Sequence, residues 1–217
     1  MMTEMKKCLK LCKYAHQFKI TIAAGLFFFV LGWIFLFTAD GINVCLAVTY
    51  LMLGPFIVIQ LMYNMLYGGI VASSPLHKSM DGSFPNMLGI VSSLFAYGMT
   101  YVGLLVNPDL QTGSLRESGN VVIAAGIAIA VVKVFDGMAY KFFVISTILF
   151  FFTFSTAMVV CTILIERTET IDLLTGSIVG LIIVAIGDAV SCLLRSVLYK
   201  CPLSPFAGGN SLRKAMK

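Results

Sequence analysis

Hydrophobic residues in this chain form long runs that are separated by short polar links. A helix needs about 20 mostly apolar residues to cross the hydrocarbon core of a bilayer. Six runs meet this requirement, and they cover Ile20–Thr38, Val44–Val71, Met87–Val106, Asn120–Met138, Phe142–Ile165 and Leu173–Tyr199. The pattern therefore predicts an all-α, polytopic membrane protein with six transmembrane helices.

Two of the six runs are irregular. The second contains Gly54-Pro55, where we expect a kink. The fourth has a short uninterrupted apolar stretch, Val121–Val132, and it ends in Lys133 and Asp136, which we expect near the membrane interface, where a long side chain can reach the headgroups. A re-entrant fourth segment would reduce the count to five spans.

The distribution of charge favours six spans. If the chain starts in the cytoplasm and crosses six times, 13 of the 15 Lys and Arg residues fall on the cytoplasmic side. The links on the opposite side hold only Arg116 and Arg167 together with six acidic residues. Cytoplasmic links of membrane proteins carry an excess of Lys and Arg. We therefore expect a multi-pass protein of the plasma membrane with both termini in the cytoplasm.

Composition agrees with a membrane protein and leaves no room for a soluble domain. Hydrophobic residues make up 59% of the chain and charged residues 12%, against about 25% charged residues in soluble domains. The expected organisation is a cytoplasmic arm (1–19), a six-helix transmembrane domain (20–199) and a basic tail (200–217). The arm alternates apolar residues and lysines at helical spacing, which predicts an amphipathic helix on the lipid surface. Because the basic residues flank the spans, the net charge of +5 does not indicate nucleic-acid binding.

Asp188 lies near the middle of the sixth run. An ionisable residue inside a membrane is costly, so its default interpretation is functional, with Lys133 or Arg195 as candidate partners. Arg195 follows seven residues later on a similar helix face. A structural hydrogen-bonding role is the alternative. Gly176-x-x-x-Gly180 permits close helix contact, and we expect the sixth span to be the most buried helix.

Motifs for catalysis are missing from the sequence. There is no G-x-S-x-G, no H-E-x-x-H and no phosphate-binding G-x-x-x-x-G-K-[ST]. We therefore expect no catalytic site, no metal and no cofactor, and any transport driven by nucleotide would need another subunit. Cys45 and Cys161 both fall toward the outer face, where a disulfide between them is possible, although spacing alone does not place them within bonding range.

The link between the second and third spans carries helix-capping signals. Ser74 can cap a helix, Pro75 suits its first position and Gly82 can end it. We expect a short cytoplasmic helix that presents Leu76, His77 and Met80 to a soluble partner. A simple turn between two spans is the alternative.

A basic interfacial helix, six spans, two cytoplasmic termini and a capped helix after the second span together resemble the ABC-2 type transporter permeases. In sequence the resemblance rests on Ser73-Ser74-Pro75-Leu76-His77-Lys78 and on Tyr140-Lys141-Phe142-Phe143. It implies that two permease subunits, identical or different, pair with separate ATPase subunits to export a substrate. It also implies that a group of loop residues couples to the ATPase: Ser74, Pro75, Leu76, His77, Lys78 and Met80.

Three other functions fit the sequence as well. The chain could be an accessory or immunity-type membrane protein without transport activity, or the substrate-binding subunit of a small-molecule importer. It could also be an intramembrane enzyme, for which Asp188 is the only candidate group.

Overall fold

The computed structural model describes Lys10 and residues 18–38, 43–66, 82–111, 113–139, 142–167 and 169–198. These residues contain no strand and form six helices that are long and apolar enough to cross a membrane. The long helices are α2 (Phe18–Thr38), α3 (Val44–Leu66), α4 (Phe84–Val106), α5 (Gly119–Ala139), α6 (Phe143–Arg167) and α7 (Leu173–Leu198). The predicted all-α, multi-pass membrane fold is confirmed.

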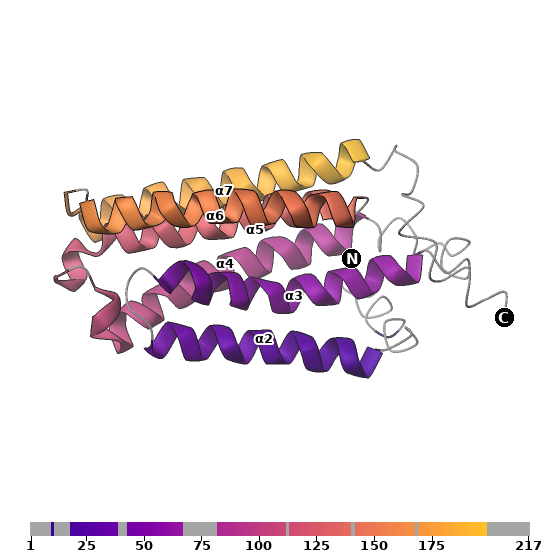
Figure 1. Ribbon diagram of the computed structural model, residues 1–217, viewed down its shortest axis with the longest axis horizontal. Coiled ribbons are helices and arrows are strands. Elements are labelled where there is room, and N and C mark those ends of the chain that lie inside the picture. Colours follow the sequence, from indigo (N-terminus) through magenta and orange to yellow (C-terminus); the bar gives the residue numbers. More distant parts are fainter. Residues whose placement is uncertain are drawn as a thin grey trace, which may run out of the picture.

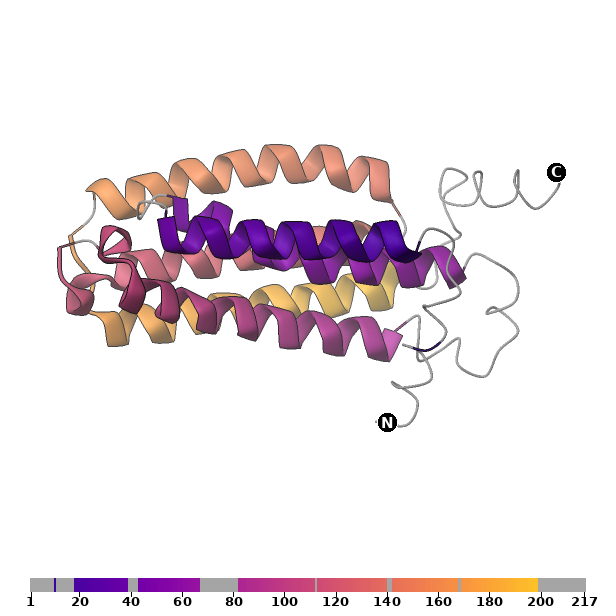
Figure 2. The same cartoon turned by 90° about the horizontal axis from the view of Figure 1, so that it is seen from below.

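Successive helices run in opposite directions along the long axis of the bundle (Figure 1, Figure 2). At one end, which we call the terminal end, α2 begins and α7 finishes. At the other, which we call the loop end, two short 3-10 helices connect α4 to α5: η3 (Pro108–Leu110) and η4 (Leu115–Glu117). Because α3 ends and α4 begins at the terminal end, the link between these two helices starts and finishes there.

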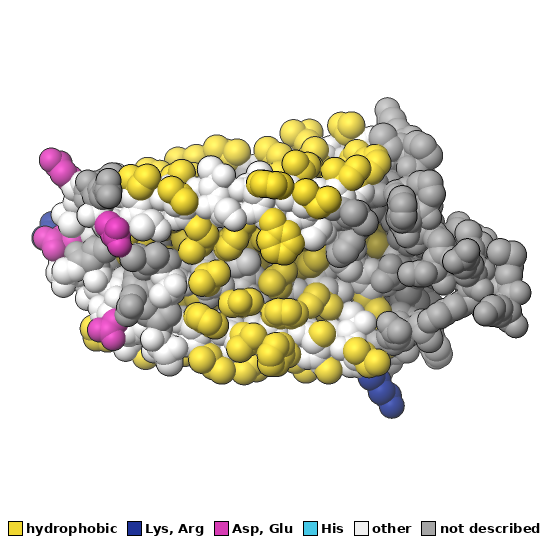
Figure 3. Space-filling model, viewed as in Figure 1, with side chains coloured by type: hydrophobic (Ala, Val, Ile, Leu, Met, Phe, Trp, Pro, Cys, Tyr) yellow, Lys and Arg dark blue, Asp and Glu magenta, His cyan; other side chains and the backbone are white. Residues whose placement is uncertain are grey.

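The surface between the two ends is apolar. Large hydrophobic side chains point outward from the helices, for example Leu105 (68% exposed), Phe151 (66%) and Phe152 (71%). In Figure 3 they cover the middle of the molecule, and acidic side chains gather at the loop end. An apolar surface of this extent would cause aggregation in water, whereas hydrocarbon is a suitable solvent for it.

Helix α5 is the centre of the bundle. Inside its span 72% of the residues are buried, compared with 28% for α7, 17% for α2 and 6% for α6. The expectation that the sixth span is the most buried helix is therefore wrong. The reason is that α7 buries one face against α5 and α4 and exposes Ile and Leu side chains on the other, whereas α5 packs against α3, α4, α6 and α7. The irregular fourth run thus forms a continuous helix of 21 residues.

Small residues allow α5 and α7 to pack closely along their length. A Cβ atom on Gly126 of α5 would lie 2.9 Å from the backbone oxygen of Gly180, and one on Gly187 of α7 would lie 2.7 Å from the Cα of Ala130. Gly119 and Gly176 make a similar contact nearer the loop end. The Gly176-x-x-x-Gly180 pattern therefore has its partner glycines on the fourth span.

Aromatic rings connect α5 to two further helices. The ring of Phe135 lies 5.0 Å from that of Phe56 on α3 and 4.7 Å from that of Phe150 on α6, measured between centroids. Offset or tilted aromatic pairs at these distances contribute about 0.5–1.5 kcal/mol beyond their buried area. Helix α3 continues through Pro55, and the adjacent Gly54 lies against Gly25 of α2.

We predict that Gly126→Ala lowers the stability of the bundle by about 1–3 kcal/mol, because the added methyl group overpacks the contact with Gly180. The matched control is Gly98→Ala on α4, where an added Cβ meets nothing within 4 Å. Both changes raise helix propensity equally. Thermal unfolding in detergent measures the difference, and equal midpoints for the two variants would contradict the close packing of α5 on α7.

Candidate functional site

Among the described residues, four charged side chains are buried inside the bundle. Lys133 and Asp136 come from α5, and Asp188 and Arg195 come from α7; their exposed fractions are 2%, 3%, 8% and 3%. We call these four residues the charge cluster. They lie in the halves of α5 and α7 nearest the terminal end. With all four groups ionised the cluster has no net charge.

The members of the charge cluster alternate in sign. Lys133 Nζ lies 3.3 Å from Asp188 Oδ1 and 3.7 Å from Asp136 Oδ2. Arg195 donates a hydrogen bond to the same Asp136 Oδ2. Each charge therefore has an opposite charge beside it, which offsets the cost of removing it from water. The pairs join α5 to α7 at two levels along the bundle axis.

Helix α4 covers the charge cluster with a stripe of polar and small residues. Ser93 donates a hydrogen bond of 2.6 Å to Asp188 Oδ2, and Asn86 Oδ1 accepts one of 2.7 Å from Arg195. Between them, a Cβ on Gly89 would lie only 2.1 Å from Lys133 Nζ. Positions 86, 89 and 93 share one helix face, so α4 contacts the cluster with three successive turns.

Some polar atoms of this region have no hydrogen-bond partner among the described residues. They are Asp136 Oδ1, Asp188 Oδ1, Arg195 Nε and the hydroxyl of Ser191, which lies between Asp188 and Arg195 on α7. An unsatisfied buried group costs about 1–3 kcal/mol. The cluster is therefore balanced in charge but incompletely hydrogen-bonded in this arrangement of the helices.

The structure tests several expectations about these residues. Asp188 pairs with Lys133, one of its two candidate partners, whereas Arg195 pairs with Asp136. The Lys133 side chain does not reach out to the headgroups, because α5 is enclosed by other helices and the Lys133 ammonium group points to carboxylates inside the bundle. The depth of Lys133 and Asp136 near the membrane interface stays a prediction. The proposed coupling residues, Ser74 to Lys78 and Met80, lie outside the described residues, as do residues 200–217 and nearly all of residues 1–17.

We call Asn86, Gly89 and Ser93 the α4 stripe, and their contact with the charge cluster was not predicted from the sequence. Asn86, Gly89 and Ser93 follow i, i+3, i+7 spacing in an otherwise apolar run, and this spacing is the signal that could have revealed it. Glycine and serine are common in transmembrane helices for packing alone. The pattern therefore indicates a polar contact only once the charged residues of α5 and α7 are known to lie beside it.

Metal binding finds no support in the part of the chain that the structure describes. No group of three or more His, Cys, Asp or Glu side chains is close enough there to hold an ion. Both carboxylates of the charge cluster already face cationic side chains. As arranged, the cluster can hold helices together and can exchange partners when they move.

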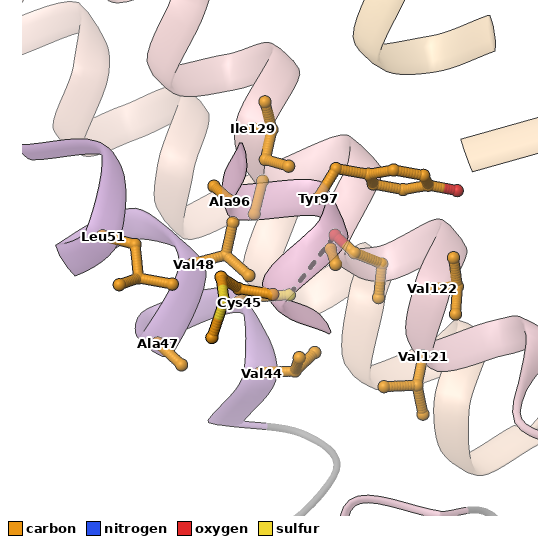
Figure 4. Close-up of a cluster of buried hydrophobic side chains, with 14 of the residues drawn as sticks. Val44, Cys45, Ala47, Val48, Leu51, Ala96, Tyr97, Val121, Val122 and Ile129 are labelled. Carbon is orange, nitrogen blue, oxygen red and sulfur yellow. Dashed lines mark hydrogen bonds between the residues drawn. The ribbon is translucent and has the colours of Figure 1, made fainter. Parts of the chain in front are cut away.

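Two cysteines near the loop end converge on one backbone atom. Cys45 of α3 and Cys161 of α6 are both free thiols, 0% and 1% exposed. Each donates to the carbonyl oxygen of Ala124 on α5, at 3.6 Å and 3.7 Å. Figure 4 shows Cys45 among apolar side chains of α3, α4 and α5 with this bond drawn as a dashed line.

Comparison with known proteins gives no relative: no family model, no curated protein and no solved structure matches this chain.

We predict that removing one charge of the cluster destabilises the protein more than removing an opposite pair. Asp188→Asn and Lys133→Met should each lower the free energy of unfolding by about 3–5 kcal/mol, because each leaves a buried charge uncompensated. The double variant keeps the cluster neutral and should lose less than the sum of the two. Unfolding in detergent measures all three.

The control is the exposed ion pair between Arg116 and Asp172 at the loop end, which spans 3.4 Å with side chains 91% and 48% exposed. Arg116→Met should cost no more than about 1 kcal/mol. Additive losses in Lys133 and Asp188, or losses as small as that of Arg116→Met, would show that the pair is not coupled.

Proposed function

We propose that this chain is the membrane-spanning permease subunit of an ABC-type exporter. It would lie in the plasma membrane with both termini in the cytoplasm, pair with a second permease subunit and dock a separate ATPase on the link between α3 and α4. Six membrane-spanning helices in one bundle support this proposal. So does the sequence, which lacks a phosphate-binding loop of its own and resembles the ABC-2 type permeases.

The observation that carries the proposal is the contact between α4 and the charge cluster. Helix α4 begins at Phe84, four positions after the last proposed docking residue, and Asn86 already binds Arg195 in its first turn. Ser93 then reaches Asp188 two turns further into the membrane. A displacement of α4 by a bound ATPase would therefore act directly on the ion pairs that join α5 to α7.

The energetics of the charge cluster suit such a movement. The hydrogen bonds from α4 to the cluster are of the kind that contributes only about 0.6–2 kcal/mol each between membrane helices, because separated helices also find polar partners in the membrane. Asp136 Oδ1 and Arg195 Nε are buried and have no hydrogen-bond partner among the described residues, so a shifted α4 or α7 could offer them new ones. Transport requires a switch between discrete helix arrangements, and exchange of ion-pair partners permits one without exposing a charge to lipid.

The distribution of charge supports the proposed orientation. Acidic side chains mark the loop end (Figure 3), and Lys19 lies at the start of α2 at the terminal end. By the positive-inside rule the terminal end faces the cytoplasm. The link between α3 and α4 would then be accessible to a cytoplasmic ATPase.

The decisive experiment is purification of the tagged chain from its native membrane in mild detergent, followed by mass spectrometry of the bound proteins. We predict that a nucleotide-binding ATPase copurifies in stoichiometric amount. Lys78→Glu, or truncation of the side chain in Leu76→Ala, should reduce the copurified ATPase several-fold, because both change the proposed docking surface. Membrane insertion should be unchanged.

Arg116→Glu is the matched control, since it reverses one exposed charge at the opposite end of the bundle. Equal ATPase recovery from the Lys78 and Arg116 variants would remove the docking assignment. A preparation with no ATPase would instead favour an accessory or immunity-type protein, and direct ligand binding by the lone chain would favour an importer's substrate-binding subunit.

A further inference from the structure

We propose that Cys45 and Cys161 form a dithiol site that closes to a disulfide and thereby fastens α6 to α3 across α5. The inference does not depend on the proposed transport function. It rests on the positions of the two thiols, which come from helices that are not neighbours in the chain and meet at one atom of a third helix.

Geometry brings the sulfur atoms together. Both thiols donate to the carbonyl oxygen of Ala124, at 3.6 Å and 3.7 Å, so the distance between the sulfurs cannot exceed the sum of these two lengths. Both side chains are buried in the same apolar cluster, and Figure 4 shows Cys45 there beside residues of the first turns of α3 and α5. Bonding requires rotation about the Cα–Cβ bonds and an approach of α6 to α3.

The surroundings oppose this movement weakly. A thiol is a weak hydrogen-bond donor, and Ala124 is an internal residue of α5, so its carbonyl oxygen keeps the helical hydrogen bond when the two thiols turn away. Helix α6 is also the least enclosed of the six, with 6% of its span buried. It can shift toward α3 with little loss of packing.

Formation of the Cys45–Cys161 bond from two thiols requires an oxidant, and a small disulfide compound can serve as one. One cysteine, as thiolate, attacks the sulfur of a small apolar disulfide RSSR, forms a mixed disulfide and releases RS⁻. The second cysteine then displaces the remaining RS⁻ and closes the Cys45–Cys161 bond. The two thiol protons leave with the two RS⁻ groups, so RSSR and two thiols become one protein disulfide and two molecules of RSH.

The bond would stabilise a helix that few contacts hold. It would close a loop of more than 100 residues, because it joins positions 45 and 161, and long loops give the largest gain in the chain-entropy model. We expect the midpoint of thermal unfolding to rise by about 5–15 °C on oxidation. Oxidation would also fix α6 against the α3–α5 pair.

The test uses the full chain with its other four cysteines, Cys8, Cys12, Cys192 and Cys201, changed to serine. The purified protein is treated with dipyridyl disulfide in detergent, and its intact mass is measured. Closure predicts the loss of two hydrogen atoms with no pyridyl adduct and release of two pyridinethiones. Reduction by dithiothreitol should reverse both the mass change and the gain in unfolding temperature.

The control moves one thiol by a single residue on α6. Cys161→Ser combined with Thr162→Cys keeps two cysteines but directs the second away from Ala124, so it should keep pyridyl adducts and remain open. Unmodified thiols or stable adducts in the Cys45–Cys161 protein would overturn the proposal. Equal closure in the control would also overturn it, because helix mobility rather than the observed geometry would then explain the bond.

Discussion

In hydrocarbon a charged side chain is stable only beside an opposite charge, and this constraint determines how the central helices pack. Lys133 and Asp136 on α5 find their partners on α7, and each pair lies within 4 Å. Because the cost of an unpaired charge exceeds the gain from most apolar contacts, the register of α5 against α7 follows from these pairs. Helix α4 then covers them with Asn86, Gly89 and Ser93.

Close packing and ion pairing support each other along the same seam. Gly126 and Gly187 allow the backbones of α5 and α7 to touch, and this approach is what brings Lys133 within 3.3 Å of Asp188. The peripheral helices α2 and α6 are attached mainly by apolar and aromatic contacts, as between Phe150 and Phe135. The bundle thus has a polar, tightly packed centre and a more exposed apolar rim.

Much of the fold follows from the sequence because the bilayer sets the length of the apolar runs and the distribution of Lys and Arg between its two sides. The six spans could be predicted in this way. The cost of a charge in hydrocarbon also suggests two candidate partners for Asp188, Lys133 and Arg195, of which the structure shows Lys133. The position of α5 at the centre could not, because burial of a membrane helix depends on which neighbours surround it, and apolar runs facing protein or lipid look alike. The α4 stripe also escaped prediction, since Gly89 and Ser93 gain their role only from charges more than 40 residues away.

Polar contacts to the charge cluster hold α4 in place beside α7. This role is tested most directly by the distance distribution between spin labels at Ile90 on α4 and Val197 on α7, which are 39% and 65% exposed, measured by pulsed electron resonance. The wild-type protein should give one narrow distribution. Asn86→Ala/Ser93→Ala should broaden it, whereas Ser92→Ala/Thr100→Ala, which removes hydroxyls bonded within α4 itself, should not. Identical narrow distributions in all three proteins would contradict the account.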